Sequence, residues 1–294
     1  MSKYIVLFIL PIIMGTAHAD DFSAALTAVN ANCSNISAQL DDLKKMAGIN
    51  TAVTGVGTAA AAGATVVGVI KANTDKKLAE ILAQIPPKTD TKTNPSVEET
   101  TQVYNETSAS ATTPDTDKLT KQSVALGNAR TGLLGASAAT NVAGAVIASK
   151  NKTDDDLQAQ IDSCVQSVSA LESTIGQARA DGIDITNARG ILSACGKWRD
   201  IDLSKINAKS KGAFISSIVG AATGVAGTAT SAAANTNNVR SGDETKEKSL
   251  NTASNVLAGG TAIASGAATV FNATQISTIK KIVAVAQECE EVLK

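Results

Sequence analysis

Four stretches rich in small residues, at about residues 51–70, 123–148, 213–239 and 249–275, share a helical pattern of apolar and polar positions, and Arg130 is the one charged residue in them. In the fourth stretch Val256, Ile263 and Val270 recur seven residues apart, a spacing that places side chains on one face of a helix. We therefore expect one apolar stripe per helix, facing inward. The stripes comprise Val53, Ala60 and Val67; Leu126, Leu133, Thr140 and Ile147; Ile215, Ile218 and Val225; and Val256, Ile263 and Val270.

Small residues run beside each stripe at intervals of about four. A glycine inside a helix costs about 1 kcal/mol relative to alanine, so several glycines per helix indicate a compensating gain. Close approach of two helix backbones supplies such a gain through added dispersion contacts. We expect the first stretch to pack against the second and the third against the fourth. The predicted helix-packing glycines are Gly55, Gly63, Gly132, Gly144, Gly220, Gly224 and Gly260.

Breaks in the pattern divide the chain. Pro86, Pro87, Pro95 and Pro114 lie in one segment rich in Thr, Ser and charged residues, which predicts a disordered linker over residues 85–118. Shorter breaks fall at residues 180–184 and 235–246. The expected fold is all-α: an elongated antiparallel helical bundle of two long, Gly/Ala-rich hairpins, with units at 20–180 and 181–294.

The first 19 residues have the features of a secretory signal. Lys3 precedes an apolar core from Tyr4 to Met14, and Ala17 to Ala19 form an A-x-A cleavage site. The core is too short to span a bilayer. We expect a bacterial-type signal peptide cleaved after Ala19, and a protein exported to the periplasm or the extracellular space.

Export favours oxidation of the cysteines, which are Cys33, Cys164, Cys195 and Cys289. Bridges Cys33–Cys164 and Cys195–Cys289 would each have their midpoint in a break, so each would close the base of a helical hairpin. A Cys164–Cys195 bridge fits its turn less well, by several residues, but remains open. The order cysteine, small-residue helix, loop, small-residue helix, cysteine occurs twice, which suggests an internal repeat.

Composition excludes most catalytic chemistry. His18 is the only histidine and lies in the signal, so the mature chain can hold no Ser-His-Asp or Cys-His arrangement and no His-based zinc site. The 26 basic side chains nearly balance the 27 acidic ones, which disfavours nucleic acid as a partner. No motif indicates a cofactor, a metal or a known family, and we expect no enzyme. Trp198 is the largest ring in the helical body and is either a partner contact or a core residue.

Two functional hypotheses follow. The first is an exported structural or protein-interaction bundle that contacts an unknown protein partner or itself. The second is a membrane-active protein whose small-residue hairpins insert into or span a bilayer, because the uncharged runs are long enough and small-residue ladders are common between membrane helices. The Gly, Ala, Ser and Thr content of the runs favours the first hypothesis, since insertion is driven by Leu, Ile, Phe and Val.

Overall fold

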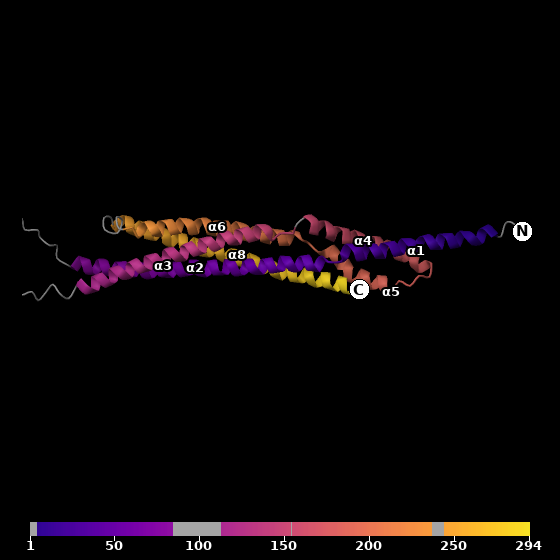
Figure 1. The fold of residues 1–294 in the computed structure, drawn as a ribbon, viewed down its shortest axis with the longest axis horizontal. Coiled ribbons are helices and arrows are strands. Elements are labelled where there is room, and N and C mark those ends of the chain that lie inside the picture. Colours follow the sequence, from indigo (N-terminus) through magenta and orange to yellow (C-terminus); the bar gives the residue numbers. More distant parts are fainter. Residues whose placement is uncertain (1–4, 85–112, 154, 237–243) are drawn as a thin grey trace, which may run out of the picture. The chain divides into compact units, whose positions relative to one another are not determined.

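The computed structural model describes residues 5–84, 113–153, 155–236 and 244–294 (Figure 1). Every regular element among these residues is helical, which confirms the all-α helical bundle. The elements in chain order are α1 (Ile5–Cys33), α2 (Ile36–Gln84), α3 (Thr113–Lys150), α4 (Asp155–Ala180), α5 (Thr186–Cys195), the 3₁₀ helix η1 (Gly196–Asp200), α6 (Ser204–Ala234) and α8 (Glu244–Val292).

Two residues in the left-handed region end helices. Asn35, with φ of 67°, separates α1 from α2, and Gly182, with φ of 75°, follows α4. After α4, Gly182 N donates to the carbonyl of Arg179 and Ile183 N to that of Ala178, the pattern of a Schellman motif. The expected break at residues 180–184 is present because glycine adopts this φ without a Cβ clash.

The predicted linker differs from the structure at its C-terminal end. Residues 85–112 lie outside the described residues, but residues 113–118 belong to α3. Pro114 occupies the first turn of this helix, where a missing N–H breaks no hydrogen bond. A proline therefore starts this helix, whereas we expected it to belong to the linker.

The chain forms two compact units, and each draws on both halves of the sequence. Unit 1 comprises residues 1–54, 143–216 and 267–294, and unit 2 comprises residues 55–142 and 217–266. This division differs from the expected units at 20–180 and 181–294. The physical reason is that helices of one expected hairpin pack against helices of the other within each unit.

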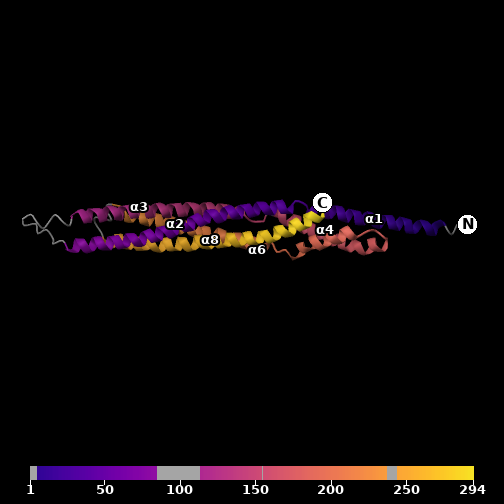
Figure 2. The same cartoon turned by 90° about the horizontal axis from the view of Figure 1, so that it is seen from below.

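Unit 1 has a conventional core of large apolar side chains. Trp198, Leu40, Leu171 and Ile279 are among its fully buried residues, and they come from η1, α2, α4 and α8. Figure 1 and Figure 2 show α1 lying alongside α4. Burying a side chain of this size contributes about 1.5–3 kcal/mol, so this core provides the ordinary hydrophobic stabilisation of a water-exposed domain.

Both disulfides lie in the same core. Cys33 at the end of α1 is bonded to Cys164 of α4, and Cys195 at the end of α5 is bonded to Cys289 of α8. All four cysteines are buried, and none is free. These are the pairs that the sequence analysis favours, and the alternative Cys164–Cys195 bridge is absent from the described residues.

Unit 2 is a four-helix bundle of α2, α3, α6 and α8, which run side by side in both views (Figure 1, Figure 2). Ser137 Oγ of α3 donates to the carbonyl of Gly57 in α2 at 2.8 Å, and Ser254 Oγ of α8 donates to that of Gly227 in α6 at 3.1 Å. Thr131 of α3 also bonds Ser231 of α6. The two expected hairpins are thus present, and each also packs against the other.

Two of the four expected inward stripes, those of α6 and α8, are wrong, and the residues of the other two stripes have intermediate exposure. Val256, Ile263 and Val270 of α8 are 71%, 77% and 63% exposed. Ile215, Ile218 and Val225 of α6 are also exposed. The positions that face inward are occupied by smaller residues, as described next.

Candidate functional site

The interior of unit 2 is a seam of small and polar residues. Along α6 the buried positions recur at alternating steps of three and four, a seven-residue repeat like that of a coiled coil. In α6 they are Ser217, Gly220, Gly224, Gly227, Ser231 and Ala234, and in α2 they are Gly57, Ala61, Ala64, Gly68, Lys71 and Thr74. The hydrophobic cluster of unit 2 is correspondingly small: Ala64, Leu134 and Ala258, with Leu133 packed against it.

Glycines on this seam bring helices into close contact. A Cβ built on Gly224 would lie 3.2 Å from Cα and 3.3 Å from N of Ala138 in α3, and one on Gly220 would lie 2.9 Å from Asn141 Cγ. Gly63 and Gly260 are looser, with their nearest neighbours, Leu133 and Thr223, at 3.5 and 3.9 Å.

The other predicted packing glycines behave differently. A Cβ on Gly55 or Gly132 would meet no atom within 4 Å, so a packing role for these two is wrong, whereas Gly144 is buried. A ladder with a constant spacing of four drifts about 40° per step around a helix with 3.6 residues per turn, so it leaves a seam whose steps alternate between three and four. The sequence analysis missed Gly57, Gly68 and Gly227, whose Cβ positions lie within 3.5 Å of neighbouring side chains.

Polar side chains bond across the same seam. Asn141 Nδ2 donates to Ser265 Oγ at 2.7 Å, and Thr261 Oγ1 donates to Thr223 Oγ1 at 2.9 Å. Asn141 also donates to the carbonyl of Ser137 at 2.9 Å. These hydrogen bonds satisfy groups that are shielded from water, so the interior of unit 2 is held together by polar contacts as well as by close packing.

Charged side chains are also buried in unit 2. The ammonium group of Lys71, 2% exposed, lies 2.6 Å from Asp75 and 3.2 Å from Glu247, and Asp75 accepts a 2.5 Å hydrogen bond from Ser123 Oγ. Arg130 is fully buried, and among the residues that the structure describes its terminal nitrogens reach the carbonyl of Asn251, at 3.5 Å. Lys71 is thus paired with two carboxylates, which are themselves partly exposed.

Large apolar side chains occupy the outer surface of unit 2. Exposed valines and isoleucines occur on each of its four helices, not on one side of the bundle: Val56 and Val66 on α2, Val142 on α3, Ile218 and Val225 on α6, and Val256 and Ile263 on α8. Single apolar residues scattered over a surface are normal, whereas an apolar patch marks a site of contact with a protein or a membrane. The usual distribution of residues between core and surface is inverted.

The exposed positions are free of charge over a defined length of each helix. The segments are residues 49–70 of α2, 131–148 of α3, 212–234 of α6 and 253–273 of α8, which are 18 to 23 residues long. Most of each segment lies in unit 2, and five to seven residues of each belong to unit 1. Every exposed residue in them is Gly, Ala, Val, Ile or Phe. At 1.5 Å per residue they extend about 27–35 Å, which matches the ~30 Å hydrocarbon thickness of a bilayer.

Threonines near this surface do not offer free hydroxyls. Thr65, Thr223 and Thr228 each donate to the carbonyl four residues earlier in their own helix, at 2.8 to 3.0 Å. The polar hydrogen of each is therefore satisfied without water. Such back-bonding is the way in which hydroxyl groups are accommodated in an apolar medium.

Four stretches of the described residues are long and apolar enough to cross a membrane, by length and composition: Ala19–Gln84, Asp115–Ala180, Ser204–Ala234 and Thr245–Val292. At most 39% of the most apolar 18-residue window in any of them is buried inside the fold. The apolar segments are thus largely uncovered by the protein itself.

Trp198, proposed as a possible partner contact, is 1% exposed and belongs to the core of unit 1. The partner role is therefore wrong for this side chain. The sequence could not separate the two alternatives, because a lone aromatic residue between Lys197 and Arg199 has no pattern that defines its face.

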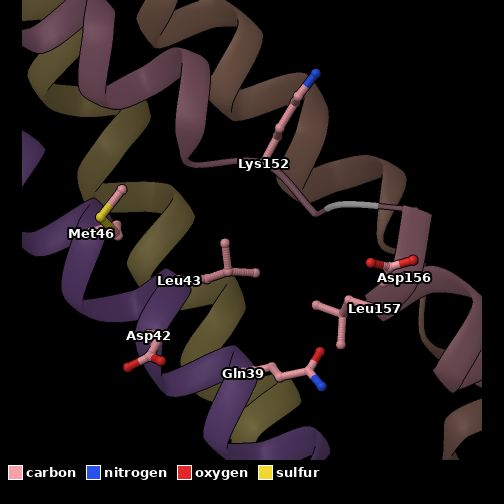
Figure 3. Close-up of a pocket in the computed structure, with 7 residues that line it drawn as sticks. All are labelled: Gln39, Asp42, Leu43, Met46, Lys152, Asp156 and Leu157. Carbon is pink, nitrogen blue, oxygen red and sulfur yellow. The ribbon is translucent and has the colours of Figure 1, made fainter.

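Unit 1 has an open pocket of about 380 Å³ between α2 and the start of α4 (Figure 3). Its carboxylates come from opposite walls, Asp42 from α2 and Asp156 from α4, and Figure 3 shows Asp42 pointing away from Asp156. Asp42 is paired with Lys45 at 3.1 Å. The pocket therefore does not bring its two carboxylates together.

The carboxylates with shifted acidity lie in turns of unit 1. Hydrogen bonds from Thr186 lower the pKa of Asp184, and those from Ser204 lower the pKa of Asp202. Both aspartates precede helices, α5 and α6, so their charge stabilises a helix start. Sulfur atoms of Cys33, Cys164 and Cys289 are close enough together to ligate a metal, but each is bonded in a disulfide and none is a thiolate.

No protein-family model, curated protein or solved structure matches the chain.

Proposed function

We propose that this protein is an exported, non-enzymatic membrane protein whose unit 2 is embedded in a lipid bilayer as a four-helix bundle, with lipid acyl chains as the partner of its outer surface. The observation that carries the proposal is the inverted distribution of side chains in unit 2. Small and polar residues form the seam, while Val and Ile lie outside on all four helices. A protein partner would need one apolar face; apolar side chains on every helix fit a medium that surrounds the bundle.

The composition argument against insertion changes when burial is taken into account. A hydrophobicity scale that is applied to one helix at a time counts every polar residue as if it faced lipid. In unit 2 residues such as Ser137, Asn141 and Ser265 bond one another inside the bundle and would not face lipid. The exposed positions alone are Gly, Ala, Val, Ile and Phe over the length of a bilayer.

The order of the cysteines supports the same arrangement. If α2, α3, α6 and α8 each cross the bilayer once, the chain returns to its starting side after every second crossing. Cys33 precedes the first crossing and Cys164 follows the second; Cys195 precedes the third and Cys289 follows the fourth. All four cysteines then lie on the exported side, where disulfides form and persist.

Membrane extraction tests the proposal. The full chain is expressed in bacteria, and isolated membranes are washed with alkaline carbonate, which strips peripheral proteins. We expect the protein to stay in the membrane pellet and to be released only by detergent. Release of the folded chain by carbonate would overturn the proposal in favour of a soluble interaction bundle.

A charge on the outer surface adds a matched test on one helix. Ile263→Lys places an ammonium at an exposed position of α8 in unit 2, and Ala284→Lys places it at an exposed position of α8 in unit 1. Near the bilayer centre a lysine costs about 2.5–3.5 kcal/mol, so Ile263→Lys is expected to reduce the carbonate-resistant fraction strongly while Ala284→Lys leaves it unchanged. Equal behaviour of the two variants would contradict a lipid-facing Ile263.

A further inference from the structure

Sulfur atoms of the two disulfides are neighbours in the core of unit 1. The Sγ atoms of Cys33, Cys164 and Cys289 all lie within 4.8 Å of one another, and all three residues are buried. Cys33 and Cys164 form one bridge, while Cys289 belongs to the other. Cys195, the fourth cysteine, lies outside this close group.

We propose that these three cysteines form an internal thiol–disulfide exchange site in which Cys289 is the attacking residue. When the Cys195–Cys289 bridge is open, the Cys289 thiolate attacks Sγ of Cys33 or Cys164. A new S–S bond forms to the attacked sulfur, the Cys33–Cys164 bond breaks, and the leaving sulfur keeps the electron pair and takes a proton from water. The number of disulfides does not change, so the step needs no oxidant or reductant.

Burial makes the exchange internal. The sulfurs of all four cysteines have no access to solvent that would admit a free thiol, whereas Cys289 already lies beside both sulfurs of the neighbouring bridge. A bridge that forms first between Cys289 and Cys33 can therefore rearrange without opening the core of unit 1: the Cys164 thiolate attacks Sγ of Cys33, the Cys33–Cys164 bond forms, and Cys289 leaves as a thiolate. The site corrects its own pairing, and this holds whether or not unit 2 is embedded in a membrane.

A cysteine variant isolates the step. Cys195→Ser leaves Cys289 as a thiol beside the intact Cys33–Cys164 bridge. The variant chain is held at mildly alkaline pH to allow exchange. It is then quenched with acid, alkylated and digested with trypsin. The four cysteines fall in separate tryptic peptides, at residues 20–44, 153–179, 190–197 and 282–294. We expect a partial loss of the 20–44/153–179 pair and the appearance of 282–294 joined to either peptide.

Cys289→Ser is the matched control. It frees Cys195, whose sulfur is outside the close group, so the Cys33–Cys164 bridge is expected to stay intact. If Cys195→Ser keeps that bridge as completely as Cys289→Ser does, while circular dichroism shows both variants folded, the proposal is wrong.

The unaltered chain provides a second measurement in case a variant does not fold. Refolding of the reduced chain with a limiting amount of oxidised glutathione, followed by acid quenching at intervals, gives chains in which only some of the bridges have formed. Mixed pairs that contain the 282–294 peptide with 20–44 or 153–179 are expected among the early species. If partly reduced chains show only the two original pairs and free thiols at all times, exchange does not occur.

Discussion

Unit 1 and unit 2 share stretches of the same four long helices but bury opposite kinds of side chain. Unit 1 encloses Trp198, leucines and isoleucines together with two disulfides. Unit 2 encloses Gly, Ala, Ser and Asn and exposes Val and Ile. Burial of apolar area drives folding only where the alternative is contact with water, so the two units are suited to different surroundings. The comparison shows that a continuous helix can follow two different packing rules along its length.

The two rules predict different responses to truncation of a large apolar side chain. Trp198→Ala removes a buried ring from unit 1 and is expected to cost about 3–5 kcal/mol of unfolding free energy. Val56→Ala removes an apolar side chain that is 60% exposed on unit 2 and is expected to change stability by less than about 0.5 kcal/mol. Denaturant unfolding in detergent measures both. Similar losses in the two variants would mean that unit 2 has a hidden apolar core.

Replacing a glycine with leucine tests the packing of unit 2 directly, because its seam depends on small residues. Gly224→Leu pushes a side chain into the backbone of Ala138 and is expected to cost about 1–3 kcal/mol. Gly132→Leu enters open space and is expected to be neutral or to stabilise α3 by up to about 1 kcal/mol through helix propensity.

Thermal unfolding of the two glycine variants in the same detergent gives the measurement. The control matters because both changes add the same atoms to a helix of unit 2. A destabilised Gly132→Leu variant alongside a stable Gly224→Leu variant would place the packing seam on the other face of these helices.

The sequence predicts the helices and the break at Gly182 correctly, because runs of small residues and a glycine between two helical patterns are local signals. It failed on which face points inward. The seven-residue spacing of Val256, Ile263 and Val270 was recognised, but an apolar stripe was assigned to the interior by a rule that holds in water. The true seam, such as Gly220, Gly224 and Gly227, repeats with the same period and lacks any large side chain to mark it.

The burial of Trp198 and the ion pair of Lys71 with Glu247 were also beyond the sequence. Both depend on residues that are far apart in the chain: Trp198 packs in a core drawn from η1, α2, α4 and α8, and Glu247 lies on a different helix from Lys71. Periodicity within one helix carries no information about which partner helix supplies the opposing side chain. In unit 2 that partner decides whether a cation inside the bundle is paired.

The smallest expected effect concerns acid stability, which we expect to reside in unit 1. The carboxylate of Asp202 accepts hydrogen bonds from Ser204 N at 3.0 Å and Ser204 Oγ at 2.5 Å, and these hold its pKa below the ordinary value. Because the pKa is lower in the folded chain than the value of about 3.9 in an unfolded one, the stabilisation is fully present above that value and is lost as the pH falls through the folded pKa. Asp202→Asn should therefore lower the unfolding temperature slightly at pH 7 and not at pH 2. The equivalent change Asp117→Asn, at an exposed site early in α3 of unit 2, serves as the comparison. If only Asp117→Asn lowered the unfolding temperature in a pH-dependent way, acid stability would not reside in unit 1.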